Sequence, residues 1–207
     1  GIMKLKKRPE IGYLPSGSTN DFARSLKIPA NLTEAARDVV SGKSYGVDIG
    51  KFGDQRYFVY IAAFGAFTEV SYSTPHVLGH QAYILESIKA LGKLKSYKMH
   101  IAWDDGEADG EFIFGMVTNT TSVGGFSGLA PKDVSFHDGL FEGLFIRTPK
   151  SPVDLPNILS GLLLFPEQEN KDMIRFKSSK FTVTADEDVP WVLDGEFGGA
   201  VKEAKIE

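Results

Sequence analysis

The chain has 207 residues, 42% of them hydrophobic and 12% aromatic, so it can form one large domain or two small ones around a sizeable core. Its formal net charge of -4 argues against nucleic acid as the main partner, because binding to the phosphate backbone generally needs a basic face. The absence of cysteine excludes disulfides and thiolate metal sites and fits a reducing compartment, and no apolar run approaches the roughly 20 residues of a membrane-spanning helix.

The first elements in chain order are short. Residues 1–9 carry four basic side chains and no acidic one, which is typical of a solvated segment or, alternatively, of a patch that contacts lipid headgroups. Ile11 to Leu14 predicts a strand and Pro15 to Gly17 a turn. Thr19 to Lys27 then predicts a helix, closed by the proline that follows.

A second helix is predicted after that proline. Thr33 is the expected N-cap residue and Gly42 the expected C-cap. We expect this helix to pack through one apolar face, made by Leu32, Ala35, Ala36, Val39 and Val40.

From about Tyr45 the helical periodicity gives way to alternating strands. A hairpin is expected around the turn at Gly53 and Asp54, and later strands at KMHIAW, EFIFGMVTN, LFEGLFIR, KFTVTAD and PWVLDG. Helices are expected at roughly Leu78 to Lys95, as a packing helix or an interfacial lipid helix, and at Val153 to Phe165. The pattern predicts an α+β fold, in which residues 43–207 form a mainly antiparallel β-sandwich with a helical insert and residues 1–42 a partial α/β unit.

Three short motifs could carry chemistry. In the first, Ser18, Thr19 and Asp21 lie where a strand, turn and helix follow one another, so they either cap the helix or let a phosphate approach its first amides, with Asp21 then facing a metal ion. In the second, Asp194 and Glu196 flank a glycine; they form a hairpin turn or, in a regular strand, a pair of carboxylates with one raised pKa, suited to a general base.

The third motif is APKDVSFHDGLFEG, where Asp138 precedes a glycine between apolar segments. A hairpin turn is one interpretation, and a Mg²⁺ or Ca²⁺ site built from this carboxylate and loop carbonyls is the other. The four histidines have no metal-ligand spacing and there is no Gly-x-Ser-x-Gly segment, so zinc chemistry and serine hydrolysis are poorly supported.

Taken together, these motifs resemble the diacylglycerol kinase catalytic-domain family, which includes soluble bacterial diacylglycerol kinases and sphingosine kinases. Five segments follow the family's order: PSGSTNDFARSLKIP, VDIGK, YFVYIAAFGAFTEVSYSTP, GGFSGLAPKDVSFHDGLFEG and LDGEFGG. The resemblance implies a lipid kinase that transfers the γ-phosphoryl group of ATP to a lipid hydroxyl, converting diacylglycerol to phosphatidic acid. Another acceptor, such as a sphingoid base, and a non-catalytic lipid-binding module are the alternatives.

The resemblance also implies roles for individual residues. Ser18 and Thr19 would lie near the ATP phosphates, and Asp21 and Asp48 would join the water network around the catalytic Mg²⁺. Glu196 would deprotonate the lipid hydroxyl, with Asp194 beside it. A structural metal would be held by the Asp138 side chain and by backbone carbonyls near Ser135 and Leu140.

The same resemblance implies a nucleotide-binding domain at residues 1–42 and a lipid-binding domain at residues 43–207. It places the protein in the cytoplasm, peripheral at the membrane, with a membrane lipid as its substrate, no nucleic acid partner, and a homodimer left open. The family's Gly-Gly-Asp-Gly-Thr nucleotide motif does not occur in these residues, so we expect a fragment that is inactive in isolation.

Overall fold

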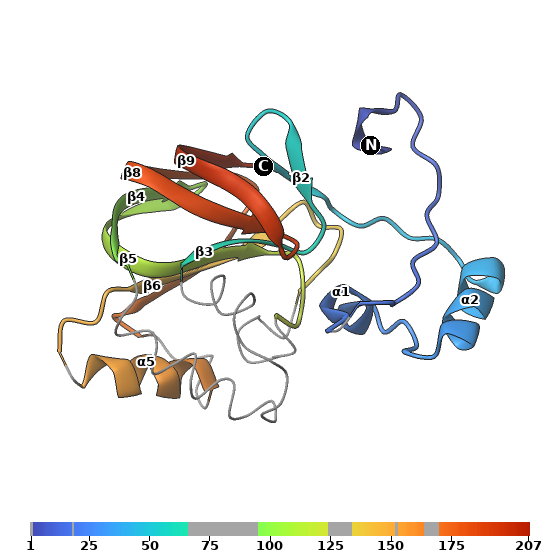
Figure 1. The fold of residues 1–207 in the computed structure, drawn as a ribbon, viewed down its shortest axis with the longest axis horizontal. Coiled ribbons are helices and arrows are strands. Elements are labelled where there is room, and N and C mark those ends of the chain that lie inside the picture. Colours follow the sequence, from blue (N-terminus) through green and yellow to red (C-terminus); the bar gives the residue numbers. More distant parts are fainter. Residues whose placement is uncertain (1, 18, 66–94, 124–133, 152, 164–169) are drawn as a thin grey trace.

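The computed structural model describes residues 2–17, 19–65, 95–123, 134–151, 153–163 and 170–207 (Figure 1). The helical elements are η1 (Ile2–Lys4), α1 (Asp21–Ser25), α2 (Leu32–Ser41) and α5 (Asp154–Leu163). The strands are β1 (Gly50–Phe52), β2 (Arg56–Phe58), β3 (Ile61–Gly65), β4 (Tyr97–Trp103), β5 (Gly106–Thr118), β6 (Phe141–Arg147), β7 (Met173–Ser178), β8 (Phe181–Leu193) and β9 (Glu196–Ile206). The helix predicted at Leu78 to Lys95, apart from its last residue, lies outside the described residues.

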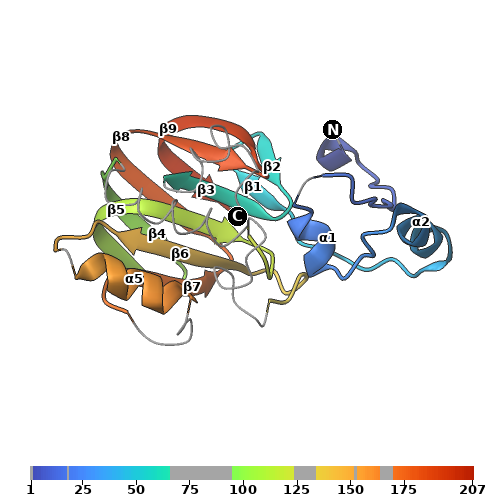
Figure 2. The same cartoon turned by 60° about the horizontal axis from the view of Figure 1, so that its bottom comes forward.

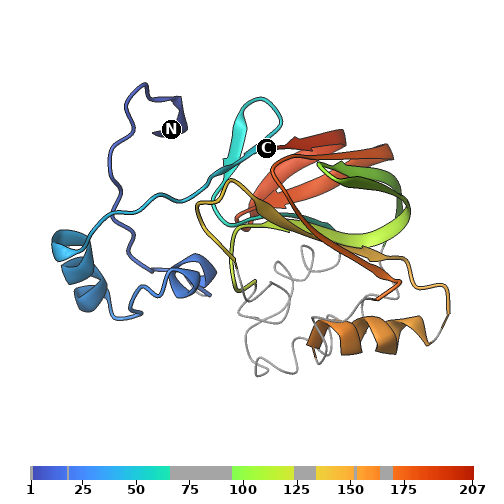
Figure 3. The same cartoon turned by 180° about the vertical axis from the view of Figure 1, so that it is seen from behind.

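The N-terminal segment stands to one side of the strands, with α1 between them and the rest of the segment (Figure 3). Among its described residues no strand forms, so the prediction of a strand at Ile11 to Leu14 is wrong. Ile11 is 65% exposed, and no described strand pairs with this stretch. The stretch packs against the helices instead of pairing with a strand: the Tyr13 ring centroid lies 5.4 Å from that of Phe22 in α1, and a Cβ on Gly12 would meet the Val39 side chain of α2 at 2.4 Å.

Helix α2 confirms its predicted end but not its predicted start, and its predicted packing only in part. Gly42 is the C-cap residue, whereas the N-cap is Asn31, whose Oδ1 accepts hydrogen bonds from the amides of Thr33 (2.9 Å) and Glu34 (3.2 Å). Of the predicted apolar face only Ala35 is buried, and Val40 is 87% exposed. The packing prediction therefore holds only in part: Ala35 is buried and Val39 lies against Gly12, whereas Leu32 and Val40 are exposed.

The nine described strands form one hydrogen-bonded sheet in the order β2-β1-β9-β8-β3-β5-β6-β7, with β4 paired to both β5 and β8. The long strands β5 and β8 each pair with β3 near one end and β4 near the other, which closes a circuit of four strands. All these pairings are antiparallel, as predicted. The sheet is nevertheless a small closed barrel with extra strands rather than a two-sheet sandwich.

The barrel replaces the sandwich because its two longest strands run on continuously. KFTVTAD and PWVLDG, predicted as two strands, belong to the single strand β8. The register of β8 against β9 shifts between Thr184 and Val189 and again between Trp191 and Val192, and β5 shifts against β6 between Phe112 and Phe114. Such bulges bend a strand without ending it, so each strand can pass from one side of the barrel to the other.

Two apolar clusters hold the strands together. One fills the barrel, where Phe64 packs against Trp191 with ring centroids 5.1 Å apart and also contacts Phe145 and Tyr97. The other lies under α5, whose Ile158 contributes to it, and Figure 2 shows this helix lying across one face of the sheet. The helix predicted at Val153 to Phe165 is thus confirmed.

Candidate functional site

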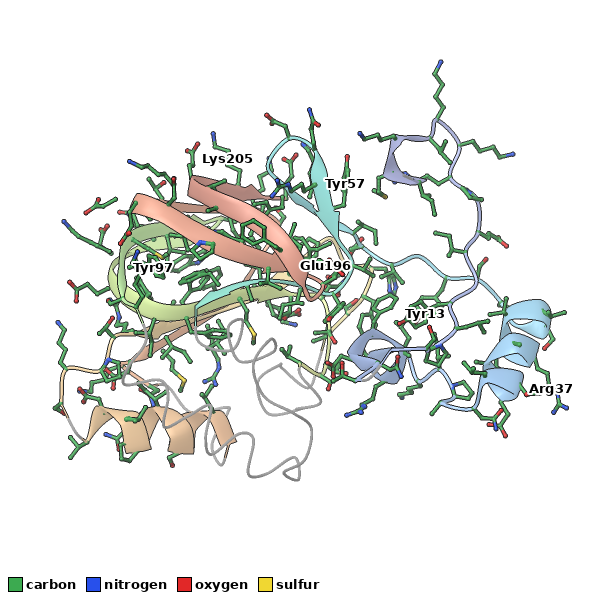
Figure 4. All side chains as sticks on the ribbon, in the orientation of Figure 1. Tyr13, Arg37, Tyr57, Tyr97, Glu196 and Lys205 are labelled. Carbon is green, nitrogen blue, oxygen red and sulfur yellow. The ribbon has the colours of Figure 1, made fainter. Side chains whose placement is uncertain are left out.

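Asp194 and Glu196 lie at the turn between β8 and β9. Leu193 pairs with Glu196, and the two residues between them, Asp194 and Gly195, have φ angles of 50° and 88°. Two consecutive positive φ angles are typical of the two-residue hairpin turn of type I′. The hairpin interpretation is therefore correct for the backbone. Glu196 is left exposed at the first position of β9, at the tip of the β8–β9 turn (Figure 4).

The Asp194 carboxylate binds the backbone that connects β2 to β3. Its Oδ2 accepts from the amide of Val59 (2.6 Å), and its Oδ1 accepts from those of Tyr60 (2.9 Å) and Ile61 (3.1 Å). Burial raises the pKa of Asp194, and the three hydrogen bonds oppose that rise. The cause of this shift is burial rather than a second carboxylate, so Asp194 acts as a clamp that fixes the turn on β3.

Tyr60 lies between this turn and α1. An ideal Cβ placed on Gly195 would be 4.0 Å from the Tyr60 hydroxyl. Burial raises the pKa of Tyr60 to about 12, and the nearby charges of Asp194, Asp21 and Tyr13 add to the rise. The phenol therefore stays protonated at neutral pH. No role was predicted for this residue from the sequence, although it lies in the segment YFVYIAAFGAFTEVSYSTP.

Asp21 sits at the start of α1 and is only 3% exposed. Its Oδ1 accepts a hydrogen bond from the Ser122 hydroxyl at 2.7 Å. One turn later, the Ser25 hydroxyl lies 2.6 Å from that of Thr120. These bonds dock α1 on the loop after β5, so Asp21 is held beside the strands.

The predicted helix cap is absent from the described residues around α1. The N-cap is Asn20, in the left-handed conformation with φ of 51° and without a side-chain capping bond. Its side-chain amide instead closes a loop with Gly17: Oδ1 accepts from the Gly17 amide, and Nδ2 donates to the Gly17 carbonyl, both at 2.8 Å. Thr19 is exposed, and Ser18 lies outside the described residues.

Asp48 and Asp138 meet at the loop before β6. The Oδ2 of Asp48 accepts from the amide of Gly139 at 2.7 Å, next to Asp138. The Oδ1 of Asp138 accepts from the amide of Leu140 at 3.1 Å. Asn119 also joins this region, because its side chain donates to the carbonyls of Asp48 (3.2 Å) and Phe136 (3.4 Å).

This loop fits the predicted structural metal in its donor chemistry. The exposed Asp138 carboxylate and the carbonyls of Ser135 and Leu140 are oxygen ligands, which Mg²⁺ and Ca²⁺ prefer. Within the described part of the chain no group of three or more His, Cys, Asp or Glu residues gathers. The structure thus brings Asp48 to the Asp138 loop, whereas Asp21 has its own partner on another loop.

Comparison with known proteins decides the family. A profile of the diacylglycerol kinase catalytic domain matches residues 1–52. Over 204 residues the chain is 36% identical to a diacylglycerol kinase of Bacillus subtilis strain 168, covering 96% of this chain and 66% of that protein. The chain belongs to the diacylglycerol kinase family.

A second relative agrees with this assignment, and two solved structures share the fold. A diacylglycerol kinase of Staphylococcus carnosus is 33% identical over 96% of this chain and 65% of its own length. A solved protein of Bacillus anthracis strain Sterne superimposes with a TM-score of 0.80 and 24% identity, over all of this chain and 69% of that one. A diacylglycerol kinase from the same organism superimposes with a TM-score of 0.71 and 21% identity, over 98% of this chain and 65% of that one. These structures confirm the fold.

The chain spans about two thirds of the length of these diacylglycerol kinases, 66% and 65% for the two curated relatives. No helix in the described residues is both long enough and apolar enough to cross a membrane.

Proposed function

We propose that this protein is a lipid kinase that transfers the γ-phosphoryl group of ATP to the hydroxyl of diacylglycerol, giving phosphatidic acid. The observation that carries the proposal is the exposed Glu196, presented on a turn that Asp194 clamps to β3, in a chain whose curated relatives are named diacylglycerol kinase. A free carboxylate on a rigid support is what a general base for a lipid hydroxyl requires.

In this proposal Glu196 accepts the proton of the lipid hydroxyl. The lipid oxygen forms its bond to the γ-phosphorus as the bond to the ADP oxygen breaks. Asp194 positions the turn, and the protonated Tyr60 hydroxyl is a neutral donor beside it. Bound Mg²⁺ would supply charge neutralisation at the phosphates.

In this proposal the N-terminal residues would help to bind ATP and its Mg²⁺. Asp21, held at the start of α1, and Asp48 would orient the waters around Mg²⁺, while Ser18 and Thr19 would lie near the ATP phosphates. Residues 1–42 would then belong to the nucleotide-binding domain and residues 43–207 to the lipid-binding domain. Asp138 with its neighbouring carbonyls would hold a structural metal. A membrane-lipid acceptor also requires contact with a bilayer surface, so we propose a peripheral protein.

The test is a pair of variants in the full-length protein that contains this chain. Glu196→Gln keeps the side chain's shape but removes its basicity, which should lower the rate of lipid phosphorylation by about 10²- to 10⁴-fold. Glu203→Gln, at an exposed position of the same strand β9, is the matched control and should keep the normal rate. The measurement is transfer of radioactive phosphate from ATP to dispersed diacylglycerol.

Three readouts decide the outcome. The melting temperature and the affinity for lipid vesicles should be unchanged in Glu196→Gln, because the residue is exposed. If both variants keep near-normal turnover, the general base lies elsewhere and the β8–β9 turn has no catalytic role. If the full-length protein phosphorylates no lipid at all while binding vesicles normally, it is a lipid-binding module.

A further inference from the structure

A cavity of about 200 Å³ lies between the neighbouring strands β5, β6 and β7 (Figure 2). Pockets for drug-sized ligands measure about 300–1,000 Å³, so this cavity suits a group smaller than a nucleotide or a whole lipid. The β8–β9 turn that carries Glu196 does not contribute to the described part of its wall. Four polar or charged side chains line it: Thr118, Glu142, Arg175 and Lys177.

These four side chains lie on one face of the sheet. Thr118 pairs with Glu142, and Glu142 pairs with Lys177, so the three form one row across the strands. Arg175 comes two residues before Lys177 on β7 and therefore points to the same face. The cavity thus gathers two cations, one carboxylate and one hydroxyl.

Two buried oxygens of this row are left without a bond. Among the described residues, neither the Oε2 of Glu142 nor the Oγ1 of Thr118 has a hydrogen-bond partner. Glu142 is 4% exposed and Thr118 is fully buried. Buried polar atoms are nearly always paired in native proteins, so these two oxygens indicate a ligand that bonds to both.

The charges of the three ionisable side chains restrict what that ligand can be. Arg175 and Lys177 outnumber Glu142, so the cavity has a net positive charge and favours an anion. The Oε1 of Glu142 lies 3.5 Å from the Lys177 Nζ, which leaves Oε2 as the atom that the ligand meets. A carboxylate oxygen only accepts hydrogen bonds, so an anion that meets it must bring a proton of its own.

Hydrogen phosphate meets both requirements. Its P–OH group can donate to the Oε2 of Glu142, while its charged oxygens accept from the Thr118 hydroxyl and attract the two cations. Sulfate has the same tetrahedral shape but no proton at neutral pH, so it would place a charged oxygen against the carboxylate. An ammonium group could donate to Glu142 but would face two cations.

We propose that this cavity binds a phosphate group that keeps a proton, either free phosphate or the end of a small phosphomonoester, and that Glu142 makes the site reject sulfate. The proposal goes beyond the proposed function and does not rest on it, because none of the four side chains belongs to the turn that carries Glu196. Its test needs neither ATP nor turnover, so its failure and the failure of the kinase proposal can be told apart.

The experiment is a titration of the 207-residue chain at pH 8 with sodium phosphate or sodium sulfate at equal ionic strength. Binding is followed by NMR through the Met116 methyl and the Thr118 amide, which report on this cavity alone. At pH 8 phosphate still carries one proton and sulfate carries none. We expect phosphate to bind at least about tenfold more tightly, because sulfate lacks the hydrogen bond to a charged acceptor and adds repulsion.

A second titration distinguishes the two sources of the phosphate group. It compares butyl phosphate with inorganic phosphate at pH 5.5, where a phosphomonoester also keeps a proton. Tighter binding of butyl phosphate would identify a phosphomonoester as the ligand, and weaker binding would identify free phosphate.

Glu142→Gln tests whether this carboxylate sets the selectivity. The amide can turn its N–H₂ group towards a sulfate oxygen, so the variant should bind sulfate more tightly than the wild type does and lose most of the preference for phosphate. A gain of sulfate binding does not arise from a loss of fold. Lys177→Gln should weaken phosphate binding severalfold because it removes one cation, whereas Lys202→Gln, at an exposed position of β9, should not.

Three results overturn the proposal. The first is the absence of any phosphate-dependent shift at Met116 and Thr118. The second is equal binding of phosphate and sulfate by the wild type at pH 8. The third is an unchanged ratio of the two affinities in Glu142→Gln.

Discussion

Asp194 contributes to stability because its carboxylate accepts three hydrogen bonds from backbone amides, those of Val59, Tyr60 and Ile61. Asp194→Asn turns one acceptor oxygen into a donor that faces N–H groups. We expect it to lower the free energy of unfolding by about 1–3 kcal/mol, measured by urea denaturation. Glu196→Gln, two residues away and exposed, should change it by less than about 0.5 kcal/mol. Equal midpoints for both variants would contradict a clamping role for Asp194.

Glu142 should make stability depend on pH. Burial raises the pKa of its carboxyl from 4.5 to about 7, and Lys177 opposes that rise. Because the folded state holds this proton more tightly than the unfolded chain, the contribution is fully present below about pH 4.5 and is lost as pH rises through 7. The loss is up to about 3 kcal/mol from this group.

Glu142→Gln should remove that part of the pH dependence. The difference in unfolding free energy between the wild type and the variant, measured from pH 5 to pH 8, isolates the group from all others that titrate in this range. Wild-type stability should fall relative to the variant as pH rises. A constant difference would mean that the carboxyl titrates alike in the folded and unfolded states.

At the scale of elements, Gly65 tests how closely β3 lies against β5, and Gly53, which also has a positive φ, is its control. A Cβ on Gly65 (φ 83°), at the end of β3, would lie 2.1 Å from the carbonyl oxygen of Ile113. A Cβ on Gly53 (φ 58°), in the β1–β2 turn, would meet nothing within 4 Å. We expect Gly53→Ala to cost about 1–2 kcal/mol of strain and Gly65→Ala clearly more.

Thermal unfolding by circular dichroism measures both variants. The Gly65 variant should have the lower melting temperature by several degrees, since the backbone of β5 must move to make room. If the two variants melt together, β3 and β5 can separate at this end without cost.

The elements that the sequence predicted well are those with a local signal. The β1–β2 hairpin follows from its Gly-Asp turn, and β6 from an apolar run. Strands β7 and β9 were missed because their sequences, MIRFKS and EFGGAVKEAKI, place charged residues at many positions. The closed barrel was missed for another reason: it depends on β4 and β3 sharing the same two partners, which no local pattern encodes.

Candidate-site residues divide in the same way. Asp194, Glu196 and Asp138 could be proposed because each lies in a short glycine-containing motif, and Asp48 because of the family resemblance. Tyr60 could not, since it comes from an unremarkable apolar run and acquires its neighbours only when α1 and the β8–β9 turn come together. Glu142 did carry a signal, a single carboxylate inside the apolar strand Phe141–Arg147.

For the molecule as a whole, we expect two very different levels of protection against hydrogen exchange. Strand β8 supplies six residues of the barrel core and β5 contributes to both apolar clusters, whereas α2 buries only Ala35. Barrel amides should exchange only through openings that cost nearly the global free energy of unfolding. The amides of α2 should exchange at least about 100-fold faster than those of the barrel. Hydrogen exchange followed by mass spectrometry measures both in one sample. Similar protection in both would show that α2 is covered in solution.

The pairing of β1 with the last residues determines how the strands would respond to a pulling force. Lys51 and Glu207 exchange two backbone hydrogen bonds, of 2.7 and 3.1 Å, and Phe52 pairs with Ile206. The start of β1 and the end of β9 therefore lie at the same end of one antiparallel pair, beside the barrel. Tension applied at these two points acts along the hydrogen bonds, which run perpendicular to antiparallel strands, and loads them one after another. Pulled in this way, the β1–β9 pair would unzip from Lys51 and Glu207 inward, at a far lower force than shearing all its bonds together would need.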